Sequence, residues 1–173
     1  MSDNTEMENQ HSIVLQDFAE QTLSSVLAGR HIAGFWMPFE QSFKMAWLFQ
    51  LSLDNEMALE FWSDPVNAGG WEEVGVLCIR LVSNPQERAG TTFEWVGAQI
   101  APFIIAKVQV LVDERPDFQA ECGLEFFNDK GEDLIVVAGI SPGSVTISAP
   151  FDRQNFDPEC YLTEYKREPL GAR

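Results

Sequence analysis

Alternation of apolar and polar residues predicts strands over most of the chain, and the clearest example lies at residues 122–149. Apolar residues flank Glu125 with the period of a strand that buries one face. The sequence Asn-Asp-Lys-Gly at 128–131 is typical of a type I turn followed by a glycine with positive φ, which closes a hairpin. The returning run at 133–138 is almost wholly apolar, so we expect it to be covered on both faces. Apolar and polar residues alternate again at 145–149. We therefore expect residues 122–149 to have a structural role.

Shorter apolar runs separated by polar turns predict further strands before this unit. The stretch 91–101 fits a strand or a short helix, and we favour the strand. Two stretches rich in Ser, Asn, Pro and Gly, 63–70 and 83–90, are expected to be loops on composition alone. The other predicted strands cover residues 31–37, 47–53, 57–61, 71–82, 104–112 and 118–126.

Helical periodicity is found near the N-terminus. Apolar residues from Leu15 to Leu27 follow the i, i+3, i+4, i+7 pattern, which places them along one face of a helix. Ser12 is a suitable N-cap and Gly29 a suitable residue just after the last turn. The sequence therefore predicts an amphipathic helix at 13–28 that packs against the sheet.

Together these elements predict an α+β fold. The N-terminal amphipathic helix would pack on a mainly antiparallel, twisted meander of about eight or nine strands, and a β-sandwich is the alternative. The length of 173 residues fits one domain. We expect a disordered acidic leader at 1–11, a single domain at 12–150 and an irregular C-terminal tail at 151–173.

Charge and cysteine usage narrow the choice of partners and compartment. The chain has 11 Lys and Arg against 27 Asp and Glu, a formal net charge of −16. Such a surface repels polyanions, so we expect no binding to nucleic acid or to an anionic membrane. Three cysteines are an odd number that favours free thiols in a reducing compartment. The polar, acidic N-terminus is unlike a signal peptide, so the sequence predicts a cytoplasmic protein.

The motifs of common catalytic, metal and cofactor sites are absent from the sequence. The histidines, His11 and His31, have no second ligand at metal-binding spacing. Cys160 lies beside carboxylates, which disfavour the reactive thiolate. The acidic residues at 54–56 and 113–117 fall in predicted turns, where they commonly serve turn formation and solubility. We therefore expect a protein that is not an enzyme, with no catalytic residues, no metal and no cofactor.

The distribution of charge indicates a candidate binding surface. Between Lys44 and Arg80 the chain has no cation, but it has six carboxylates and five Trp or Phe residues. A solvated acidic face is the commoner meaning of such a run. The other interpretation is an acidic surface with exposed aromatic residues that binds a basic protein. The candidate binding residues are Glu60, Trp62, Asp64, Glu72 and Glu73.

Three functions fit this description. The first is a non-enzymatic acidic protein-binding domain, with inhibitors or immunity-type proteins of basic targets as one instance. The second is a small-ligand pocket, possibly enzymatic, inside a curved sheet, where Arg80, Glu94 or Lys107 would supply polar contacts. The third is a structural domain that forms a homodimer through exposed aromatic residues.

Overall fold

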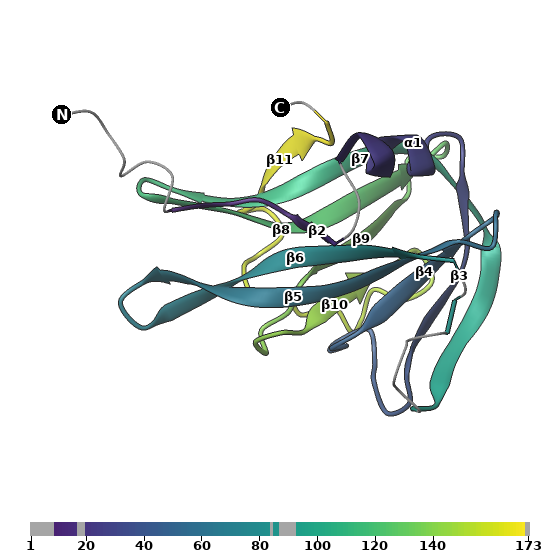
Figure 1. Cartoon of the computed structure of the whole chain (residues 1–173), viewed down its shortest axis with the longest axis horizontal. Helices are drawn as coiled ribbons and strands as arrows, with labels where there is room; N and C mark the ends of the chain where they lie inside the picture. The colour runs from purple at the N-terminus through teal and green to yellow at the C-terminus, as the bar shows by residue number, and fades with distance from the viewer. Residues whose placement is uncertain (1–8, 17–19, 84, 87–92, 172–173) are drawn as a thin grey trace.

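The computed structural model describes residues 9–16, 20–83, 85–86 and 93–171. These residues form one mixed sheet of eleven strands and a short helix (Figure 1). Antiparallel pairs predominate, and β1 with β8 and β2 with β6 are parallel pairs. The elements are β1 (Gln10–His11), β2 (Val14–Gln16), α1 (Glu20–Leu27), β3 (His31–Pro38), β4 (Phe49–Leu53), β5 (Ala58–Gly69), β6 (Glu72–Val82), β7 (Trp95–Arg115), β8 (Phe118–Asn128), β9 (Asp133–Ala138), β10 (Val145–Ser148) and β11 (Lys166–Pro169).

Strand β7, which is 21 residues long, joins the two halves of the sheet. Its first half pairs with β3 as far as Ile104, and its second half pairs with β8 from Ile105 onward. The order of neighbours is β10-β9-β8-β7-β3-β4-β5-β6-β2. The sheet folds over so that β8 to β10 face β4 to β6 across a shared core. The predicted β-sandwich would need two separate sheets, whereas β7 makes this sheet continuous.

The main core lies between the two halves of the sheet. Phe49 and Phe61, from β4 and β5, are fully buried together with Phe126 from β8. A second cluster packs on the opposite face of β9, where Val137 shares contacts with Tyr165 of the C-terminal segment. Burial on both faces explains why β9 is almost entirely apolar.

The predicted hairpins are confirmed. Strand β4 pairs with β5, β7 with β8, and β8 with β9. In the turn after β8, Asn128 Oδ1 accepts hydrogen bonds of 3.0 and 2.8 Å from the backbone N–H groups of Lys130 and Glu132, and Gly131 has a φ of 81°. The stretch 91–101 is a strand from Trp95 onward, and residues 91 and 92 lie outside the described part.

The predicted α+β fold with a helix at 13–28 is wrong, because the fold is nearly all β. Residues 14–16 form β2, which pairs with residues 78–80 of β6, and residues 17–19 lie outside the described part. Helix α1 has eight residues, about two turns, of which Leu23 and Leu27 are buried. The exposed edge of β6 offers residues 14–16 a ladder of hydrogen bonds, and this long-range partner overrides the local helical period.

Three further segments differ from the simplest expectation. Residues 63–69 of the predicted loop belong to β5, and Pro65 is tolerated there because β4 pairs with β5 only as far as Phe61, which leaves an edge. Gln10 and His11 of the predicted leader pair with β8, and residues 1–8 lie outside the described part. Strand β11 of the predicted tail pairs with β7.

Candidate functional site

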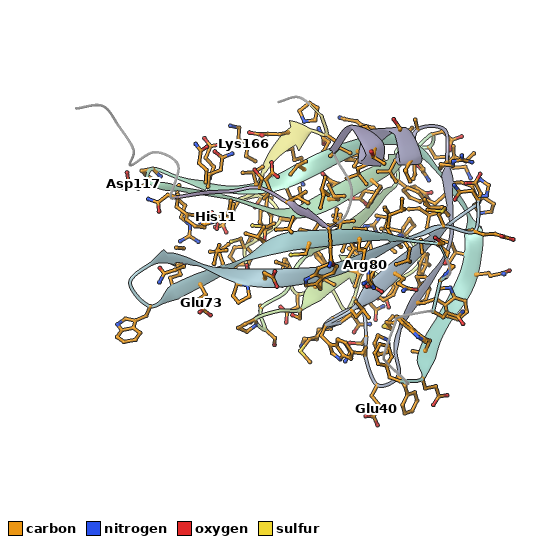
Figure 2. All side chains as sticks on the ribbon, viewed as in Figure 1. His11, Glu40, Glu73, Arg80, Asp117 and Lys166 are labelled. Carbon is orange, nitrogen blue, oxygen red and sulfur yellow. The ribbon has the colours of Figure 1, made fainter. Side chains whose placement is uncertain are left out.

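The predicted acidic residues lie mainly on the β5–β6 hairpin, which projects from one end of the molecule near the β7–β8 hairpin (Figure 1). Glu73 marks the first hairpin and Asp117 the tip of the second (Figure 2). An ion pair of 2.7 Å between Glu72 Oε1 and Arg115 Nη1 connects the two hairpins. We call the exposed residues of both hairpins the acidic hairpin surface: Asp64, Trp71, Glu72, Glu73, Glu114 and Asp117.

The turn between β5 and β6 holds Trp71 in solvent. Gly69 and Gly70 have φ values of 119° and 60°, a region that favours glycine. Asn67 Oδ1 accepts a hydrogen bond of 2.7 Å from the backbone N–H of Gly69 and stabilises the turn. The indole of Trp71, which follows this turn, is fully exposed. Burial of such a side chain removes roughly 150–250 Å² from water, so Trp71 is a strong potential contact for a partner.

Carboxylates outnumber cations on this surface. The nearby cations Arg115 and Lys166 are both engaged, Arg115 with Glu72 and Asp113 and Lys166 with Glu114 at 2.6 Å. Glu73 and Asp117 form no ion pair with any residue that the structure describes. The surface therefore keeps negative charge available for a cationic partner.

Glu60, the first of the predicted binding residues, does not belong to this surface. Its side chain is fully buried, Oε1 accepts a hydrogen bond of 2.5 Å from Arg80 Nη2, and Oε2 accepts one of 2.8 Å from Gln50 Nε2. Trp62 lies two residues further along β5 and is half-buried. Side chains alternate along β5, so Glu60 and Trp62 lie on the face opposite Phe61, which points into the main core. This alternation does not show that Gln50 and Arg80, from the neighbouring strands, enclose the carboxylate of Glu60. The exposed members of the predicted set are Asp64, Glu72 and Glu73.

The sequence alone did not mark Trp71, Glu114 or Asp117 as binding residues. For Trp71 a signal existed, because two glycines directly before a tryptophan between two strands indicate an aromatic residue near a turn. For Glu114 and Asp117 no local signal could place them near Glu73. Their position depends on the pairing of β7 with β8 and on the Arg115–Glu72 contact.

A half-buried carboxylate, Glu159, lies against β6. Glu159 accepts hydrogen bonds of 2.9 and 3.2 Å from the backbone N–H of Gly75 in β6. Its pKa is raised from the ordinary value of 4.5, mainly because burial disfavours the charged form, and the nearby carboxylate of Asp113 adds to the increase. The ionised form of Glu159 is therefore less stable in the folded protein than in the unfolded chain.

We expect the stability of this region to decrease as the pH rises. Well below pH 4.5 Glu159 is protonated in both states and has no effect on stability. As the pH rises through 4.5 the unfolded chain loses this proton first, so the folded protein loses stability until the pH passes the raised pKa, above which the loss is constant. In Glu159→Gln, whose amide oxygen can still accept from Gly75, the urea midpoint should fall less steeply between pH 4.5 and 8. The control is Glu73→Gln, which removes the same charge from the surface. Identical pH profiles for the two variants would contradict this expectation.

The two histidines and Cys160, considered above as candidate reactive groups, make contacts that are typical of structural residues. His11 packs against Phe118, with 5.5 Å between ring centroids, and His31 Nδ1 lies 3.5 Å from Asp54 Oδ2. Cys160 is the most exposed of the three free thiols, and burial, followed by Asp113, raises its pKa to about 11. A thiol with this pKa is protonated at neutral pH and is a weak nucleophile. Among the described residues, no group of three His, Cys, Asp or Glu side chains is arranged to hold a metal ion.

A groove, which we call the β7 groove, follows the first half of β7. It has a volume of about 680 Å³ and lies between residues 98–104 and the turn at 128–132. Phe35 and Phe151 form an apolar end, with their rings stacked at 5.8 Å between centroids. None of the polar groups predicted for a ligand pocket lines the groove, namely Arg80, Glu94 and Lys107.

Comparison of the chain with protein-family models, with curated proteins and with solved structures found no match. Within the described residues, the structure has no helix with the length and apolar character that crossing a bilayer requires.

Proposed function

We propose that this chain is a non-enzymatic, acidic protein-binding domain that binds a basic protein through the acidic hairpin surface. The observation that carries the proposal is the full exposure of Trp71 among carboxylates on a projecting hairpin. Interface hot spots are rich in tryptophan and are surrounded by a polar rim. In this proposal Trp71 supplies most of the affinity, and the carboxylates supply orientation and fast association.

The net charge of −16 supports a basic partner over other proteins, because long-range attraction concentrates a cationic partner near the surface. Proteins that act on nucleic acid carry basic surfaces, and an acidic domain can occupy such a surface. An inhibitor or immunity-type protein is therefore one form that this function could take. We do not propose a small-ligand site in the β7 groove, because the polar groups expected for it lie elsewhere.

We expect Trp71→Ala to weaken the complex with a basic partner by about 2 kcal/mol, roughly thirtyfold. The partner would be isolated as a basic protein that elutes from the immobilised chain in high salt, and its affinity then measured by calorimetry. The control is Trp47→Ala, which removes another exposed tryptophan outside the acidic hairpin surface. Equal affinities for the wild type and Trp71→Ala would reject Trp71 as the anchor.

The contribution of charge to binding is measured separately, by the association rate constant and its dependence on salt. Glu73→Lys should lower the association rate constant and reduce its dependence on salt, because the charge lies on the contact surface. Glu40→Lys makes the same change of charge far from Glu73 (Figure 2) and should have a smaller effect. Affinity that does not decrease with salt for the wild type would reject a basic partner.

A further inference from the structure

The first half of β7 has a free edge. Residues 95–104 pair with β3 on one side, while β8 pairs with the other side of β7 only from Ile105 onward. No described residue pairs with the free side of residues 95–104, and the β7 groove lies along residues 98–104 where a further strand would fit. Unpaired N–H and C=O groups along a strand edge are a template for pairing with another chain.

The same stretch carries no charge. Between Glu94 and Lys107 every side chain is neutral, although the chain as a whole has a net charge of −16. Gly97, Ala98, Gln99 and Ala101 are exposed, as is Ile104 further along the strand. Charged residues are a usual means of protecting a sheet edge from association, and this stretch has none of its own; Asp129, Lys130 and Glu132 lie across the groove, on the turn after β8.

The two terminal strands of the sheet have different surroundings. Strand β2 has three residues and β10 has four, so neither offers a long edge. The outer side of β10 is already occupied, because Ala46 exchanges two hydrogen bonds with Val145 and Phe43 accepts one from Ile147. Short or covered edges do not support association. Residues 64–69 of β5 also lack a second neighbouring strand among the described residues, but they include Asp64 and Pro65, which disfavour pairing. The free side of β7 is therefore the better place to extend this sheet.

We propose that a second copy of this chain pairs with the free edge of β7, so that two sheets join into one across a two-fold axis. Two copies with a net charge of −16 repel each other least along this stretch, because no side chain of residues 95–101 is charged and no like charges meet in the ladder. The turn across the groove adds Asp129 and Glu132, together with Lys130. A basic partner would instead be attracted to the acidic hairpin surface. The pairing is antiparallel and isologous, as the symmetry of a dimer requires.

Pro102 limits the register of this pairing. It has no N–H to donate, so the ladder covers residues 95–101, and its centre falls at Ala98. Pairing about Ala98 places Trp95 opposite Ala101 and Val96 opposite Ile100 of the second copy. The two Ala98 residues face each other, with Cβ atoms about 4.5–5.5 Å apart.

The test is the mass of the full chain by sedimentation equilibrium from micromolar to near-millimolar concentration, without any partner. We expect the wild type to reach twice the monomer mass of 19.5 kDa and Ala98→Glu to stay monomeric, because two carboxylates would face each other at the axis. Ile140→Glu adds the same charge at an exposed residue outside the groove and should still dimerise. Circular dichroism shows whether each variant is folded.

Cross-linking tests the register. In a Cys160→Ser background, Ala98→Cys should form a disulfide-linked dimer on mild oxidation, whereas Ala101→Cys, which lies away from the axis, should not. A wild type that is monomeric at every concentration would overturn the proposal, and so would a folded Ala98→Glu variant that still dimerises. Saturable binding of an apolar dye to a monomer, abolished in Phe151→Ala, would assign the groove to a small ligand instead. The proposed function can fail without affecting this result, because no partner is present.

Discussion

Replacing Arg80 with methionine is expected to lower the free energy of unfolding by about 3–5 kcal/mol. Glu60 is fully buried, and Arg80 is the cation that compensates its charge at 2.5 Å. In the variant Gln50 would remain as a neutral donor at 2.8 Å, which is insufficient for a buried carboxylate. Methionine keeps much of the apolar stem of arginine, so loss of the charge dominates the effect. Urea denaturation at pH 7 measures the change.

Neutralising Glu60 instead of Arg80 should lower the free energy of unfolding by less. Glu60→Gln keeps an acceptor for Gln50, and the Arg80 side chain, which is 24% exposed, can contact water when its partner is neutral. Arg80 Nε is buried with no partner among the described residues, so the native pair is itself incompletely compensated. Adding Glu60→Gln to Arg80→Met should therefore recover much of the loss. Additive losses in the double variant would contradict the burial of this carboxylate.

Phe126→Ala is expected to cost about 3–5 kcal/mol, because it leaves a cavity in the main core between the two halves of the sheet. Phe126 is fully buried on β8, opposite Leu134 of β9 and Val108 of β7. These strands belong to one continuous sheet, so neighbouring side chains cannot close the cavity without shifting the backbone. Thermal and urea denaturation should both show the loss.

The neighbouring residue is a matched control for this change. Phe127 points to the opposite face of β8, is half-buried, and lies 5.4 Å below Lys107 Nζ. Phe127→Ala should cost about 1 kcal/mol, the typical value of an exposed cation–π contact. Similar losses in the two variants would show that alternation along β8 does not define the core.

The acidic hairpin surface and the free edge of β7 lie at opposite ends of the molecule (Figure 1). A dimer formed through β7 would therefore leave Trp71 of both copies accessible. Two such surfaces on one particle would raise the apparent affinity for a partner that carries two basic sites. The two proposals thus agree with each other but are tested by separate measurements.

Several structural features follow directly from the sequence. Alternation around Glu125, the asparagine and glycine at 128–131 and the apolar run at 133–138 predicted two paired strands, and both form as expected. These signals are local, because side chains alternate along any strand and a turn depends on its own few residues. The residues of the β4–β5 and β7–β8 hairpins were predictable for the same reason.

The predictions that failed depend on distant residues. Residues 14–16 have a helical period but pair with β6, some sixty residues later in the chain. Pro65 indicates a loop, yet it lies in β5 because that part of the strand has a neighbour on one side only. Glu60 was expected on the outside, and its position on that face was correct, but Gln50 and Arg80 from the neighbouring strands enclose it.

The sequence by itself determined the strands of the β4–β5, β7–β8 and β8–β9 hairpins, the turn at 128–131, the excess of negative charge and the absence of charge between Glu94 and Lys107. Only the tertiary structure decided that Trp71 is fully exposed, that Glu60 is buried, and that residues 95–104 keep a free edge. The physical reason is that period, turn chemistry and charge are properties of short segments. Burial and edge pairing are set by which distant strands become neighbours when the sheet folds over at β7.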